Sequence, residues 1–211
     1  RFKAAAWDAR GYGDSDDYEG ALQFEYFTWD VLRVAEHFKA RKLHLVGLSM
    51  GGRIARNVAL RVPERVHSIV MISTDPGFDT LPTSRVMQFV NERRVRTPQS
   101  LKTLLGSGSS RAAYEELLDS VSRIHEASYQ KTLEVSVAQD RGAPIEKIRV
   151  PTLVIAGEED SAYPPELAEE MARRIPGAEF MMFERTGHLA NLEQPDKFNQ
   201  AVFDFVSRHT P

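Results

Sequence analysis

The chain has 211 residues, of which 42% are hydrophobic and 27% are charged, a balance that is typical of a folded globular protein. Its 27 basic and 30 acidic residues are interspersed and give a net charge of −3, so we expect no nucleic-acid surface, which would need a concentrated basic face. Cysteine is absent, which excludes a disulfide framework, a thiolate metal site and a cysteine nucleophile, and is compatible with the cytoplasm, where we expect the protein.

Residues 2–7 at the start of the chain are predicted to form a strand. A turn follows at residues 8–16, where Gly11 and Gly13 allow positive φ, and we favour a purely structural role for it. A chain that starts inside its own sheet is unusual, so we expect the native protein to have further residues before Arg1.

Residues 43–55 predict a short buried strand, a sharp turn and a helix. The strand is apolar except for one histidine, and the helix has an apolar stripe at Ile54, Ala55, Val58, Ala59 and Val62. Between them lies Gly47-x-Ser49-x-Gly51. Glycines suit a strained turn in which chain segments approach closely, and such a turn places the serine hydroxyl beside the free N–H groups of the helix. The alternative is a glycine-rich turn with an incidental serine.

A helix over residues 24–41 and a strand over residues 66–72 flank this unit. The resulting order, β–α–β–α–β with short links, predicts an α/β fold with a mostly parallel sheet and helices on its faces.

The alternation stops at residues 78–148, which contain no predicted strand. We expect four helices there, at residues 83–94, 98–105, 110–125 and 127–140. Residues 106–109, Gly-Ser-Gly-Ser, are predicted to be a flexible link. We interpret residues 78–148 as a small helical lid inserted into a core made of residues 1–77 and 149–211. A solvated structural appendage is the alternative.

The sheet resumes after this insertion. We expect, in order, a strand at 150–156, a helix at 166–174, a strand at 179–183 and a helix at 196–208.

Serine is a weak nucleophile unless a base lies within hydrogen-bond reach and a third group orients that base. Of the six histidines, only His188 directly follows a strand, so it should lie at the sheet edge that carries Ser49. The acids that follow strands are Asp160, Asp75, Glu158 and Glu159. Asp160 is preferred because its loop precedes that of His188, giving the chain order Ser, acid, His. Asp75 remains the alternative acid, because the sequence alone does not say whether Asp75 or Asp160 lies closer to His188.

Four segments resemble the α/β-hydrolase superfamily in their order along the chain: DARGYGDS at 8–15, VGLSMGG at 46–52, PTLVIAGEED at 151–160 and TGHLANLEQP at 186–195. The resemblance implies that Ser49 is the nucleophile, Asp160 the acid, His188 the base and the Met50 N–H an oxyanion donor. Family members also carry a His-Gly loop upstream, which supplies a second oxyanion N–H. This chain lacks that loop and the strand leading to it, so we expect N-terminal strands to be missing.

Within the superfamily the chain looks most like 3-oxoadipate enol-lactonases and small carboxylic-ester hydrolases. That likeness implies hydrolysis of a small ester or lactone through an acyl-enzyme, without a cofactor or metal. The alternatives are a carbon–carbon bond hydrolase of ring-cleavage products and a non-catalytic ligand-sensing protein. No membrane partner is expected, and a homo-oligomer is possible.

The substrate pocket should be lined by the insertion and the strand-end loops. Our candidates for substrate binding are Met87, Phe89 and Leu189, with Met50, Phe78 and Val90 as further lining residues. Ordinary core packing is the alternative for each. Four arginines are considered for a substrate carboxylate, or else for a solvated surface: Arg53, Arg85, Arg93 and Arg94.

Overall fold

The computed structural model describes residues 2–77, 83–94, 96–140 and 142–210, without the side chains at 85, 89, 92 and 93. Its centre is a sheet of four parallel strands in the order β1-β2-β3-β4. These strands are β1 (Leu43–Leu48), β2 (Val66–Ile72), β3 (Thr152–Gly157) and β4 (Glu179–Phe183). The parallel pairing confirms the predicted α/β fold.

The two central strands are buried on both faces, as expected for parallel strands made of continuous apolar runs. Val70 of β2 pairs with Val46 on one side and with Leu153 on the other, and this register brings the carboxyl ends of the strands to one edge. That edge therefore receives every loop that follows a strand.

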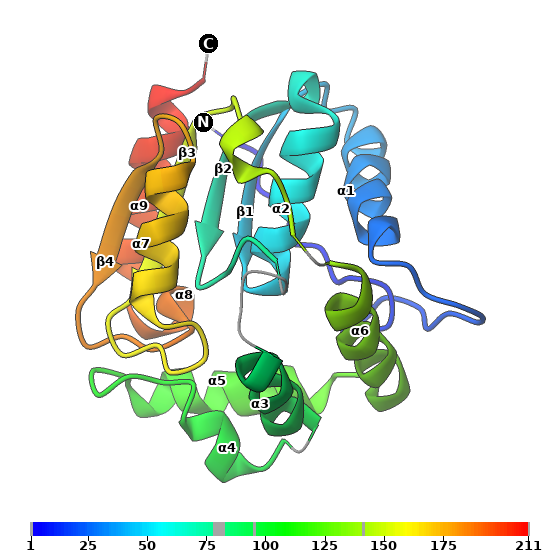
Figure 1. The fold of residues 1–211 in the computed structure, drawn as a ribbon, viewed down its shortest axis with the longest axis vertical. Coiled ribbons are helices and arrows are strands. Elements are labelled where there is room, and N and C mark those ends of the chain that lie inside the picture. Colours follow the sequence, from blue (N-terminus) through cyan, green and yellow to red (C-terminus); the bar gives the residue numbers. More distant parts are fainter. Residues whose placement is uncertain (1, 78–82, 95, 141, 211) are drawn as a thin grey trace.

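Helices cover both faces of the sheet (Figure 1). One face packs against α2 (Met50–Arg61) and α7 (Pro165–Arg174), with α1 (Glu25–His37) lying against α2. The other face packs against α9 (Pro195–Arg208), which buries Phe198, Phe205 and Val206 on the sheet. The short helices are α8 (Ala190–Glu193) and the 3-10 turns η1 (Pro63–Arg65) and η3 (Ile145–Lys147). Among the described helices, none has the length and apolar character needed to cross a membrane.

The segment between β2 and β3 contains the four predicted helices: α3 (Thr83–Arg94), α4 (Pro98–Lys102), α5 (Arg111–Ser122) and α6 (Glu126–Gln139). In Figure 1, α3, α4 and α5 lie beyond the carboxyl ends of the strands, at the bottom of the view, and α6 lies at the lower right, below α1. Local capping explains two of their starts, because Thr97 forms a capping box with Ser100 and Ser110 accepts the N–H of Ala113.

The strand predicted at residues 2–7 is wrong: the segment is irregular and mostly exposed. It lies beside β1, where the Phe2 ring meets the rings of His44 and Phe203 edge-on. Its three consecutive alanines favour strand structure weakly, and within the described chain no strand pairs with it. The apolar pattern alone therefore did not suffice to make a strand.

Candidate active site

The turn between β1 and α2 holds Ser49 in a strained conformation. Its φ of 52° and ψ of −114° lie in a region that residues with a Cβ rarely adopt. Two contacts at the end of β2 fix this conformation. Ser49 N–H donates to the carbonyl of Ile72, the last residue of β2 (2.8 Å), and the hydroxyl of Thr74, just after the strand, donates to the Ser49 carbonyl (2.8 Å). The surrounding structure thus holds the serine at the tip of the turn, as the sequence pattern predicts.

Close approach explains two of the nearby glycines. A Cβ on Gly47 would lie 2.2 Å from the Gly51 carbonyl oxygen, and a Cβ on Gly52 would lie 2.7 Å from Cγ2 of Thr74. Both distances are shorter than side-chain atoms tolerate. Gly51 differs, because a Cβ there would meet nothing within 4 Å. Close approach of the neighbouring chain therefore requires glycine at position 47, as predicted, but not at position 51.

An acid–histidine pair lies on the loops after β3 and β4. Nδ1 of His188 donates to Oδ2 of Asp160 (2.9 Å), and both side chains are buried. The other carboxylate oxygen of Asp160 accepts the N–H groups of Ala162 and Tyr163, each at 2.9 Å. Burial is the largest single influence and raises the pKa of Asp160. The hydrogen bond and charge of His188, together with the N–H of Tyr163 and the hydroxyl of Ser73, outweigh it, so the pKa is lowered overall. The carboxylate is therefore held ionised, facing the imidazole.

Two further contacts hold His188 in place. The ring of Tyr163 stacks on that of His188, with centroids 5.5 Å apart and planes 18° apart. The main-chain N–H of His188 donates to the carbonyl of Leu104 in the insertion (2.7 Å). Among the described contacts, Ser49 and His188 are not joined by a hydrogen bond. Such contacts in active sites are often long until substrate binds.

The competing acid, Asp75, has different partners. It is 1% exposed, and its Oδ1 accepts the N–H of Gly77 (2.6 Å). Its carbonyl oxygen accepts from Arg56 of α2 (3.2 Å). In the described structure His188 thus pairs with Asp160 and not with Asp75.

The Gly-Ser-Gly-Ser segment does not behave as the predicted flexible link, because it is docked on the strand-end loops. Glu159 accepts the N–H (2.5 Å) and hydroxyl (2.8 Å) of Ser107, and the Gly108 N–H donates to the Arg185 carbonyl (2.9 Å). A Cβ on Gly106 would lie 2.6 Å from the Arg185 carbonyl oxygen. These glycines therefore permit close docking of the backbone.

The docked segment also contacts Glu193, which the sequence reasoning missed. This carboxylate is buried and accepts the Gly106 N–H (2.7 Å). The sequence signal for it was its place shortly after His188 in TGHLANLEQP, one of the segments that resemble the α/β-hydrolase superfamily.

The residues proposed to bind substrate do not all gather at this edge. Leu189 is buried beside His188 in an apolar cluster with Leu101 and Leu117, against which Leu48 is packed. Met50, the first residue of α2, is half-buried. Other candidates lie apart: Met87 on α3 is 54% exposed, Val90 is half-buried on α3, and Phe78 and the Phe89 side chain lie outside the described residues.

A buried charge cluster lies behind the turn. Arg53 and Arg56 of α2 both form ion pairs with Asp140, the residue that follows α6. Arg53 is therefore committed to an internal carboxylate. Of the other arginines considered, Arg94 is exposed, and the side chains at 85 and 93 lie outside the described part.

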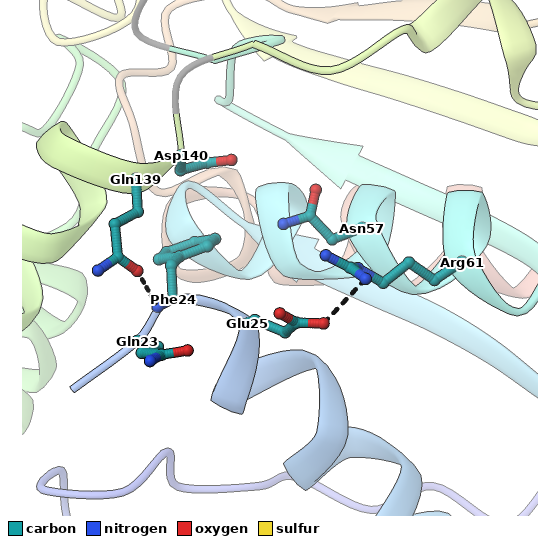
Figure 2. A pocket seen from close by; sticks show the side chains of 7 residues that line it. All are labelled: Gln23, Phe24, Glu25, Asn57, Arg61, Gln139 and Asp140. Atoms are coloured by element: carbon teal, nitrogen blue, oxygen red, sulfur yellow. Dashed lines mark hydrogen bonds and ion pairs between the residues drawn. The ribbon is translucent and has the colours of Figure 1, made fainter. Parts of the chain in front are cut away.

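A small pocket of about 180 Å³ adjoins this cluster, lined by Gln23, Phe24, Glu25, Asn57, Arg61, Gln139 and Asp140 (Figure 2). In it, Gln139 accepts the N–H of Phe24 (2.9 Å), and Glu25 pairs with Arg61 (2.8 Å). None of the predicted site residues lines it. We conclude that these contacts tie the end of α6 to α1 and α2. Within the described residues, no group of three or more His, Asp or Glu side chains is placed to hold a metal ion.

The fold and site together define a class. A parallel sheet that carries a serine in a strained strand-to-helix turn, and an acid–histidine pair on later strand ends, is the arrangement of the α/β-hydrolase fold.

Comparison with known proteins agrees with this class. The profile of the Alpha/beta hydrolase family matches residues 1–201, and the chain belongs to that family of hydrolytic enzymes. The 2-hydroxy-6-oxononadienedioate/2-hydroxy-6-oxononatrienedioate hydrolase of Paraburkholderia phymatum is 31% identical over 95% of this chain and 75% of its own length.

Solved structures extend the comparison. The enol-lactonase from Burkholderia xenovorans superposes with a TM-score of 0.80 at 26% identity, over 95% of this chain and 79% of its own. A thermophilic esterase from Thermogutta terrifontis gives a TM-score of 0.79 at 26% identity, over 95% and 78%. Similar proteins thus include an esterase, an enol-lactonase and a 2-hydroxy-6-oxononadienedioate/2-hydroxy-6-oxononatrienedioate hydrolase.

Proposed function

We propose that the protein hydrolyses a small carboxylic ester or lactone through a Ser49–His188–Asp160 triad. The observation that carries this proposal is the strained Ser49 at the sheet edge that also bears the buried Asp160–His188 pair. Nucleophilic acyl transfer requires a serine within reach of an oriented base, and strained backbone conformations are found at functional positions of this kind.

In this mechanism His188 takes the Ser49 proton as the hydroxyl oxygen attacks the substrate carbonyl. Asp160 keeps the Nδ1 proton in place and stabilises the imidazolium. The N–H of Met50, in the first turn of α2, has no partner within its own helix and is available to the oxyanion. His188 then returns the proton to the leaving group and activates the water that releases the acid product.

The insertion, residues 78–148, is proposed as a lid over this edge. Its helices contribute Leu101 and Leu117 to the apolar cluster that includes Leu189 and touches Leu48, next to the nucleophile. Leu101, Leu117 and Leu189 are buried, so the cluster packs the insertion onto this edge of the sheet. A homo-oligomer and a cytoplasmic location stay predictions.

A second candidate is hydrolysis of a carbon–carbon bond in a ring-cleavage product. The 31% identity to the Paraburkholderia phymatum hydrolase, whose name gives 2-hydroxy-6-oxononadienedioate and 2-hydroxy-6-oxononatrienedioate as substrates, favours this candidate. The same three side chains would serve this reaction, so the substrate and not the triad separates the two candidates. A ligand-sensing role without turnover is the third possibility considered from the sequence.

The test is a substrate panel containing p-nitrophenyl esters of increasing chain length, an enol-lactone and a vinylogous diketone from ring cleavage. Ester or lactone turnover that is lost in Ser49→Ala supports the proposal. Turnover of the diketone alone favours the second candidate, and stoichiometric binding without turnover favours sensing. Ester hydrolysis that persists in Ser49→Ala would overturn the serine mechanism.

A further inference from the structure

We propose that Glu193 is a positioning residue for catalysis, one that clamps the His188 loop and the docked segment of the insertion, residues 103–109, into a single unit. This inference rests on the proposed function, since it concerns how His188 is presented to Ser49.

Glu193 holds the backbone on both sides of His188. Its Oε1 accepts the N–H of Gly187 (3.0 Å) and that of Leu189 (3.1 Å). Both donors are buried, so without this carboxylate two neighbouring N–H groups would be left unpaired. The main chain that carries the imidazole is therefore fixed from within its own loop.

The second oxygen of the same carboxylate reaches the insertion. Oε2 accepts the N–H of Gly106 (2.7 Å) and the hydroxyl of Ser109. The two loops are in backbone contact at this point, because a Cβ on Gly187 would lie 2.5 Å from the Leu104 carbonyl oxygen. One carboxylate thus joins segments that are far apart in the sequence.

The described partners of the Glu193 carboxylate are all uncharged hydrogen-bond donors. Among the described residues it forms no ion pair, and its partners are backbone N–H groups and one hydroxyl. An amide in its place would turn an N–H₂ group toward N–H donors, so one of the two loops would lose its acceptor.

The position of His188 depends directly on this unit. Its own N–H donates to the Leu104 carbonyl in the docked segment (2.7 Å), so three consecutive backbone N–H groups, those of Gly187, His188 and Leu189, are held there. Displacement of a catalytic group by about 1 Å costs on the order of 10²-fold in rate. Loosening the clamp should therefore lower turnover.

The experiment compares Glu193→Gln with Glu184→Gln, a matched control that makes the same charge change at an exposed position before the same loop. With a p-nitrophenyl ester we expect Glu193→Gln to lower kcat by about 10- to 100-fold with little change in KM, and the control to match the wild type. Glu193→Asp keeps the charge but shortens the reach, and should also lower kcat.

Amide hydrogen exchange gives a readout that does not depend on substrate. In Glu193→Gln, exchange should rise together in residues 103–109 and 186–193. An unchanged kcat in folded Glu193→Gln, or faster exchange in one segment only, would overturn the proposal. Should Glu193→Gln not fold, Ser109→Ala, which removes one donor, must lower kcat to a smaller extent or the proposal fails. Absence of turnover in wild type and control alike would count against the proposed function instead.

Discussion

Replacement of Asp160 by Asn tests the site most directly, because it alters one hydrogen bond and almost no volume. The remaining oxygen can still accept the N–H groups of Ala162 and Tyr163. The new amide N–H₂ faces Nδ1 of His188 and donates to it, which leaves the proton on Nε2. An imidazole in that tautomer cannot take the proton of Ser49.

The expected loss follows from the same geometry. The wrong tautomer in a comparable triad lowers kcat about 10⁴-fold, a worked case in serine proteases, and at 1.36 kcal/mol per tenfold this corresponds to about 5 kcal/mol of activation free energy. The assay is kcat for a p-nitrophenyl ester, normalised to folded protein by circular dichroism.

Asp75→Asn is the matched control for this prediction, because Asp75 is equally buried and bonds to Gly77 instead of His188. It should keep most of the activity per folded molecule. A large loss in Asp75→Asn together with an active Asp160→Asn would refute the assignment of the acid.

Three further predictions concern stability. The lowered pKa of Asp160 means that its ionised form stabilises the fold above its unfolded value, near 3.8, and that this contribution is lost as pH falls through the folded pKa. Urea unfolding of wild type and Asp160→Asn should therefore differ most above pH 4 and converge in acid. Asp140→Asn removes the shared partner of Arg53 and Arg56 and should cost about 3–5 kcal/mol in urea unfolding, whereas a loss below about 1 kcal/mol would contradict burial of this cluster. Gly47→Ala, whose Cβ would meet a carbonyl oxygen at 2.2 Å, should yield little folded protein by circular dichroism, and a native-like yield would contradict the tight turn.

Much of the fold was predictable because its signals are local. Apolar runs separated by helical patterns predicted the parallel sheet, and the four helices of the insertion follow from their periodicity and capping residues. The pairing of Asp160 with His188 was predictable as a preference, since parallel strands deliver the loops that follow them to one edge.

Two predictions were wrong for the same reason, because each considered a segment without the residues that it contacts in the fold. Residues 2–7 have a strand-like pattern, yet a strand exists only through hydrogen bonds to a neighbour, and within the described chain none pairs with them. Residues 106–109 have the composition of a flexible linker, yet two distant carboxylates, Glu159 and Glu193, fix them. Composition reports the freedom of an isolated chain, whereas docking adds the contacts that remove it.

The amino-acid sequence by itself determined the order of elements, the turn at Ser49 and the small set of side chains able to act as base and acid, because these depend on spacing along one stretch of chain. Tertiary structure alone decided which acid faces His188 and that Arg53 forms a buried ion pair with Asp140. It also decided that Glu193 joins the insertion to the loop that carries the histidine. Those outcomes depend on distances between residues remote in sequence, which only the packing of the sheet and its loops sets.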